Sequence, residues 1–209
     1  MTRNASPLVT ALEGAWEFLQ GRYPELPDTV IVLGSGAGKG GMTHWGTWTP
    51  RAWKAGKKTV GEFMLAGERN TLGAEQVYET VLHEAAHALA EGRGIKDTSR
   101  QGRYHNTKFK AVAEELGLTV EKDPGPYGWA FTSYKANKKD EGESRILRSI
   151  KDALKIERPI PPQEDIPPSA PVSALCECGC PRKLRLKDKT RDEGPVICGI
   201  CDTEFVEVR

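Results

Sequence analysis

The sequence predicts a mixed α+β fold with a small three-stranded sheet and several helices. Apolar residues at helical spacing predict a first helix over residues 7–20. A β-branched run at 29–33, an aromatic alternating stretch at 45–53 and a further stretch at 59–66 predict the three strands. An apolar-periodic helix over residues 71–92 follows them. This order is typical of α+β domains rather than of regularly alternating α/β folds.

The rest of the chain predicts further elements and a domain boundary. An amphipathic helix is expected from Thr107, another helix over 141–156, and short strands at 118–122 and 129–134. Six prolines lie between residues 158 and 172, in a polar context that favours an extended linker. We therefore expect a first domain at 1–157, a linker at 158–172 and a small module at 173–209.

The composition excludes several classes of protein. Hydrophobic residues make up 38% and charged residues 28% of the 209 residues, which disfavours a disordered chain. The net charge of +1 excludes a molecule that binds nucleic acid over its whole surface. The N-terminus has no apolar signal-peptide core, and no run of about 18 apolar residues predicts a membrane span. We expect a cytoplasmic protein without a membrane partner.

A motif in the helix at 71–92 carries the expected chemistry. His83, Glu84 and His87 form the pattern H-E-x-x-H. Residues four apart lie on one helix face, so both imidazoles can reach one metal ion. Glu84 lies beside that face, where a carboxylate can hold a zinc-bound water and take its proton. The motif predicts a zinc hydrolase with Glu84 as its general base.

A catalytic zinc needs a third protein ligand and one open position. His105 is the only histidine after His87 and precedes a predicted helix, so we expect it to be that ligand. Glu114 and Glu115 are the alternatives, although a charged pair in the middle of a helix is more typical of a solvated surface. His44 lies among aromatic residues in a predicted strand and is expected to be a packed or surface histidine.

These residues resemble the SprT-like zinc metallopeptidase family, the group related to Spartan. The resemblance rests on the segment TVLHEAAHAL at 80–89 and on a G-x-x-H-x-x-x-F stretch from Gly102 to Phe109, and it covers about residues 5–135. It implies a zincin-like domain that hydrolyses peptide bonds, with DNA-associated or DNA-crosslinked proteins as substrates and His105 as the third ligand. The loop at 91–104 departs from the family in being longer and more basic.

Five cysteines near the C-terminus predict a second metal site. They form two groups separated by a hairpin-length segment, which is a zinc-ribbon pattern. We expect Cys176, Cys178, Cys198 and Cys201 to bind a structural zinc, with Cys180 as the alternate ligand. A disordered tail of free thiols is the alternative.

Cations between the two cysteine groups predict DNA as a binding partner. Arg182, Lys183, Arg185 and Lys187 follow one another along the predicted hairpin, so several would lie on one face and contact DNA phosphates. A merely solvated hairpin explains them equally well. The leading hypothesis is a zinc endopeptidase that acts on a protein or peptide and is brought to DNA by its ribbon. The alternatives are a non-enzymatic nucleic-acid-binding adaptor with a zincin scaffold and a zinc hydrolase of non-peptide substrates.

Overall fold

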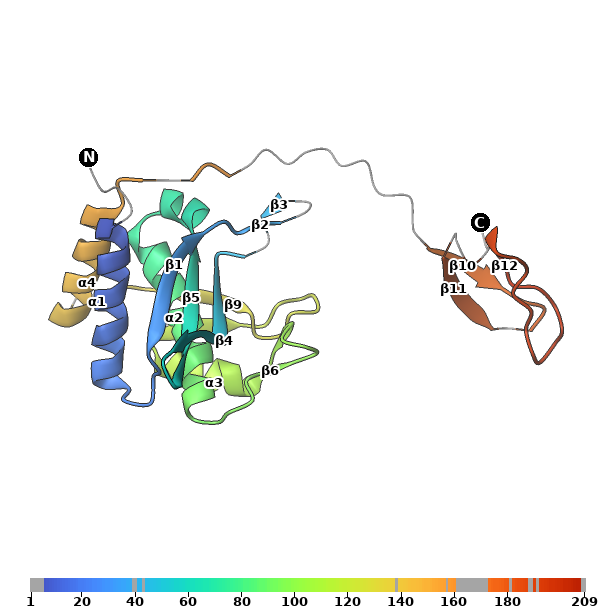
Figure 1. Ribbon diagram of the computed structural model, residues 1–209, viewed down its shortest axis with the longest axis horizontal. Helices are drawn as coiled ribbons and strands as arrows, with labels where there is room; N and C mark the ends of the chain where they lie inside the picture. The colour runs from blue at the N-terminus through green and yellow to red at the C-terminus, as the bar shows by residue number, and fades with distance from the viewer. Residues whose placement is uncertain are drawn as a thin grey trace. The chain divides into compact units, whose positions relative to one another are not determined.

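The computed structural model describes residues 6–38, 41–42, 44–137, 139–156, 158–160, 173–180, 182–187, 190 and 192–207 (Figure 1). The chain divides into two compact units, Met1–Pro162 and Gln163–Arg209. Most of the predicted linker, residues 161–172, lies outside the described residues. Arg158 belongs to the first unit, because its N–H donates to the Gly67 carbonyl at 3.3 Å and its guanidinium lies 3.2 Å from the buried Glu68 carboxylate. This unit therefore continues past residue 157, where the first domain was predicted to end.

The sheet of the first unit contains the three predicted strands, β1 (Thr29–Gly34), β4 (Gly46–Ala55) and β5 (Lys58–Ala66). Their order is β1-β5-β4, with β5 parallel to β1 and antiparallel to β4. β4 is therefore an edge strand, and its register shifts between Thr49 and Trp53. A short pair, β2 (Ala37–Gly38) and β3 (Gly41–Met42), lies between β1 and β4 in the chain.

The described residues of the first unit form four α-helices beside this sheet: α1 (Ser6–Arg22), α2 (Ala74–Gly92), α3 (Thr107–Glu115) and α4 (Glu141–Ala153). α2 begins later than the predicted residue 71, because a 3-10 helix, η1 (Gly67–Leu72), precedes it and Gly73 takes a φ of 96°. α3 begins at Thr107 as predicted. There the Asn106 side chain accepts hydrogen bonds from the N–H groups of Lys108 and Phe109.

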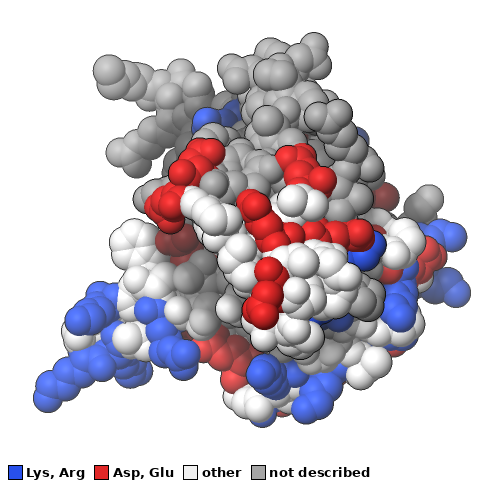
Figure 2. All heavy atoms as spheres, turned by 90° about the vertical axis from the view of Figure 1, so that its right-hand side faces the viewer, with Lys and Arg blue, Asp and Glu red and all other residues white. Residues whose placement is uncertain are grey.

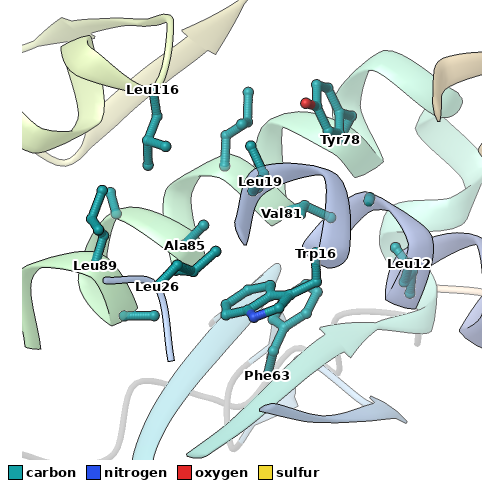
Figure 3. Packing of buried hydrophobic residues seen from close by; sticks show 14 of the residues in the cluster. Leu12, Trp16, Leu19, Leu26, Phe63, Tyr78, Val81, Ala85, Leu89 and Leu116 are labelled. Atoms are coloured by element: carbon teal, nitrogen blue, oxygen red, sulfur yellow. The ribbon is translucent and has the colours of Figure 1, made fainter. Parts of the chain in front are cut away.

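A hydrophobic core joins α1, α2 and the sheet (Figure 3). Trp16 of α1 stacks on Phe63 of β5 and on Trp48 of β4, with ring centroids 5.8 and 5.7 Å apart. Ala85 and Leu89 of α2 are fully buried in the same cluster. The H-E-x-x-H motif is thus carried by a helix that the core holds in place.

Two short antiparallel pairs follow α2. The loop expected at 91–104 contains β6 (Thr98–Ser99) and the start of β7 (Tyr104–His105), which pair with each other. Left-handed φ values at Arg100, Gln101 and Gly102 close the turn between them. β8 (Leu118–Glu121) and β9 (Phe131–Tyr134) confirm the two later strands.

The second unit is a small antiparallel sheet in which β10 (Ser173–Glu177) lies between β11 (Lys183–Lys187) and β12 (Val206–Glu207). Its buried hydrophobic cluster consists of Cys176, Cys198 and Phe205. The chain is therefore mixed α+β with small sheets, as predicted. In the described part of the chain, no helix combines the length and apolar character needed to cross a membrane.

Candidate metal centres

Three histidines of the first unit converge on one point and form the histidine group. His83 and His87 lie one turn apart on α2, and His105 ends β7. One ring nitrogen of each lies within 4.8 Å of the others, and Nε2 of His87 is 3.2 Å from Nε2 of His105. The structure thus brings together the three residues that were predicted as ligands.

Backbone pairing explains how the segment after α2 returns to the helix. Thr98 of β6 pairs with His105. On the other side, the His105 N–H donates to the Tyr127 carbonyl and the Trp129 N–H donates to the His105 carbonyl, each at 2.9 Å. His105 is therefore held between two segments rather than carried by a free loop.

The other candidate ligands have different surroundings. Glu115 forms an ion pair with Arg93 at 2.7 Å, and Glu114 pairs with Lys110 one turn earlier on α3. His44, which was expected to be either a packed or a surface histidine, is exposed. Among the described residues, none of these three side chains belongs to the histidine group.

Each imidazole of the group has a partner at Nδ1. The contacts join His83 to Thr132 Oγ1 at 3.2 Å, His87 to Asp97 Oδ2 at 2.5 Å and His105 to the Tyr127 carbonyl at 3.3 Å. They leave Nε2 of each ring available and fix the ring's orientation, as is usual for metal-binding histidines. No sequence pattern singles out Asp97 or Thr132, since both come from segments whose approach to α2 is decided by tertiary contacts.

Phe109 forms one wall of the histidine group. It is fully buried, and its ring centroid lies 4.9, 4.6 and 4.5 Å from those of His83, His87 and His105. Burial, together with the neighbouring imidazoles, lowers the pKa of His83 well below its ordinary value and lowers the pKa of His105 to about 4. Both rings are therefore neutral at neutral pH, which is the form that binds a metal.

Glu84 is buried between α2 and the start of β4. A Cβ at Gly46 would lie 3.0 Å from Glu84 Oε1 and 2.6 Å from the side chain of Thr80, so glycine is needed for this close approach. Burial raises the pKa of Glu84, while His87 and the backbone N–H of Trp48 oppose the shift. A carboxylate of raised basicity thus lies beside the histidine group and next to an edge strand.

Four sulfur atoms in the second unit form the cysteine group, made of Cys178, Cys180, Cys198 and Cys201, all within 4.8 Å of one another. The structure places Cys180 in this group instead of Cys176, which corrects the predicted ligand set. Cys176 lies inside β10, where pairing with β11 and β12 fixes its backbone and its side chain is fully buried. After the strand ends, the turn at Gly179 brings the sulfur of Cys180 to 3.3 Å from that of Cys178.

Hydrogen bonds to sulfur favour the thiolate at Cys198 and Cys201, whereas the contact with the Cys178 sulfur raises the pKa of Cys180 to about 12. The backbone N–H of Cys201 lowers the pKa of Cys198, and the hydroxyl and N–H of Thr203 lower the pKa of Cys201 to about 5. The same hydroxyl accepts a hydrogen bond from the Gly179 N–H at 2.6 Å. Thr203 therefore links the two halves of the cysteine group, a role that its position after the last cysteine did not reveal.

Neither a family model, nor a curated protein, nor a solved structure matches this chain. The donor atoms narrow the choice of ion. Three imidazoles with an open position and four thiolates are both donor sets that zinc takes in proteins. Magnesium and calcium prefer oxygen ligands, which neither group supplies.

The predicted nucleic-acid contacts lie on or next to β11. Arg182, Lys183, Arg185 and Lys187 are all exposed. Lys183 forms an ion pair with Glu177 of β10, which offsets its charge. Lys183, Arg185 and Lys187 alternate along the strand and so share one face. Exposed cations on one face agree both with a phosphate-binding surface and with a solvated one.

Proposed function

We propose that this chain is a zinc-dependent endopeptidase of the SprT-like type, with a zincin-like first unit. His83, His87 and His105 are the metal ligands and Glu84 is the general base. The convergence of three imidazoles, of which burial keeps those of His83 and His105 neutral, with a buried carboxylate beside an edge strand carries the proposal. A structural zinc site closes its fourth position with a further ligand, whereas three ligands and an adjacent base are typical of hydrolytic zinc.

The side chains of this site have different roles in peptide hydrolysis. When bound, zinc supplies a Lewis acid that acidifies water and polarises a carbonyl group. Glu84 accepts a proton from the attacking water at its carboxylate and delivers it to the nitrogen of the leaving amine. Its raised pKa suits the first transfer, because a more basic carboxylate takes the proton more readily. Asp97 and Thr132 hold two of the imidazoles in orientation through Nδ1.

The edge strand β4 offers a way to hold an extended peptide. Its outer side pairs with no other strand among the described residues, and an extended chain can add to such an edge through backbone hydrogen bonds. Gly46, at the start of β4, lies against Glu84, so a peptide added there would pass close to the base. Because the recognition is through the backbone, we propose protein segments of varied sequence as substrates. The resemblance to SprT-like peptidases extends the proposal to DNA-associated or DNA-crosslinked proteins.

The test compares wild type with Glu84→Gln on a DNA-binding protein and for self-cleavage, with and without single-stranded DNA. We expect the substitution to slow cleavage by about 10²–10⁴-fold and to leave the zinc content unchanged, since Glu84 is a base and not a ligand. Glu75→Gln, at an exposed position of the same helix, is the matched control and should cleave like wild type. Equal cleavage by Glu84→Gln would remove the peptidase proposal. Cleavage at the same rate with and without single-stranded DNA would rule out only the proposal that the substrates are DNA-associated or DNA-crosslinked proteins.

A non-enzymatic adaptor is the second candidate, and the exposed cations Arg185 and Lys187 favour it. In both functions we propose that the cysteine group holds a structural zinc, because four thiolates leave no open position. An adaptor would bind nucleic acid through the ribbon and would release no peptide in the cleavage assay. The buried Glu84 favours the enzyme, since a scaffold has no use for a base that costs free energy to bury.

A further inference from the structure

The hairpin that joins β4 to β5, residues 50–59, is exposed along its whole length. Trp53 pairs with Val60, and Ala55 pairs with Lys58 at the tip. Gly56 takes a φ of 64°, which allows a tight two-residue turn. The hairpin therefore extends the edge of the sheet as a regular two-stranded ribbon with its side chains in solvent.

Four cations lie on this hairpin: Arg51, Lys54, Lys57 and Lys58. Arg51 lies 3.5 Å from Glu91 of α2, which offsets part of its charge. Among the described residues no acid forms an ion pair with Lys54, Lys57 or Lys58. In Figure 2, Lys and Arg side chains gather in local groups rather than covering the whole of the face shown. The hairpin is thus a local region of positive charge on a chain whose net charge is only +1.

Trp53 supplies an aromatic surface on the face of the hairpin that also carries Lys58, which pairs with Ala55, whereas Lys54 lies on the opposite face. It keeps 45% of its surface exposed. Its Nε1 donates a hydrogen bond to Glu62 Oε2 of β5 at 2.8 Å, which restrains the indole. An exposed, restrained indole on the same face as Lys58, with Lys57 at the turn, combines the two elements of single-strand binding, phosphate neutralisation and base stacking.

We propose that the β4–β5 hairpin binds single-stranded nucleic acid, with Lys54, Lys57 and Lys58 on the phosphates and Trp53 stacked on a base. A single strand is favoured over a duplex because only an unstacked base presents its face to an indole. This surface is separate from the cations of β11, and it does not depend on the peptidase proposal. Cations on an edge strand also discourage strand-to-strand association, but Lys57 and Lys58 lie at the turn and on β5 rather than on the edge.

Binding is measured by fluorescence anisotropy with labelled oligo(dT) of about 20 nucleotides, longer than one ~4–16-nucleotide site. The full chain carries Glu84→Gln so that self-cleavage does not interfere. The triple variant Lys54→Ala, Lys57→Ala, Lys58→Ala should bind about tenfold or more weakly. The slope of log affinity against log salt should also fall by about 2, since each lost contact removes about 0.7. Lys135→Ala, Lys139→Ala, Lys151→Ala removes the same charge at other exposed positions of the first unit and should change neither quantity.

Trp53→Ala should weaken binding about fivefold or more, while Trp53→Phe, which retains an aromatic ring, should retain most of the affinity. A duplex of equal length and anionic vesicles serve as competitors, and both should displace the oligonucleotide poorly. Equal affinity of the two triple variants would overturn the proposal, as would stronger competition by vesicles than by unlabelled oligo(dT). Self-association of the hairpin variant with unchanged affinity would assign its lysines to edge protection instead. Loss of all binding in the double variant Arg185→Ala, Lys187→Ala would instead assign the binding site to β11 of the second unit.

Discussion

The two candidate metal centres differ in how much buried protein core holds their donor atoms in place. The histidine group is carried by α2, which packs through Val81, Ala85 and Leu89 into a large core shared with α1 and the sheet. The cysteine group belongs to a unit whose buried cluster is Cys176, Cys198 and Phe205, so one of its few buried residues is itself a candidate ligand. In the first unit the fold positions the donor atoms, whereas the zinc proposed for the second unit would supply most of that unit's stability.

This difference matters for what each ion can do. A preorganised site keeps its geometry with an open position, which is what catalysis needs. A site that supplies the stability of its own module has to be closed. The contrast between a rigid histidine group and a metal-dependent cysteine group makes four predictions, given from the largest expected effect to the smallest.

Removing metal with a chelator should separate the two units most clearly. The second unit should lose the roughly 10–16 kcal/mol that a structural zinc contributes and should unfold, while the first unit keeps its core. All five tryptophans lie in the first unit, so their indole NMR signals should stay dispersed while signals from residues 173–207 collapse. Collapse of both sets of signals together would show that the histidine group also depends on metal for its fold.

Cys180→Ser and Cys176→Ser form a matched pair in the second unit. Cys180→Ser should remove about one equivalent of zinc and unfold the ribbon, because a structural site loses a thiolate. Cys176→Ser should keep the zinc and weaken the small buried cluster to which Cys176 belongs. Metal analysis with limited proteolysis measures both. The reverse outcome would restore Cys176 as the ligand.

Phe109→Ala tests the support of the histidine group from the protein side. Its fully buried ring touches all three imidazoles, so the substitution should cost about 3–5 kcal/mol in the free energy of unfolding of the first unit. Urea unfolding followed by tryptophan fluorescence reports this unit alone. Phe131→Ala, at a side chain that is 55% exposed, is the control and should change stability little. Similar losses in the two variants would contradict the preorganised site.

Asp97→Asn should have the smallest effect, confined to metal affinity. The carboxylate contacts Nδ1 of His87, so losing its charge should weaken zinc binding at the histidine group by about 10–100-fold without unfolding the unit. Competition with a zinc-binding dye measures this affinity, and the ribbon's zinc should be unaffected. Asp152→Asn, exposed on α4, is the control. Unchanged affinity would mean that the helix and Phe109 orient His87 on their own.

Features that depend on short-range periodicity were accessible from the sequence. His83, Glu84 and His87 follow from the helical repeat, and the three strands follow from β-branched and alternating stretches. His105 was reached by elimination, because few other side chains after α2 suit a metal. The α2 start and the β6–β7 pair were missed, since Gly73 and the turn near Gly102 act through backbone conformations that side-chain patterns do not encode.

By itself the sequence determined that two histidines and a glutamate share one helix, that a third histidine follows, and that a cysteine-rich module ends the chain. Only the tertiary structure decided that the sulfur of Cys180, rather than that of Cys176, lies with the other three, that Gly46 admits β4 next to Glu84, and that Asp97 and Thr132 face the imidazoles. The physical reason is the distance along the sequence between the residues that interact. Helical spacing is a local property of consecutive residues, whereas ligand choice and ring orientation depend on contacts between segments that meet only when the chain has folded.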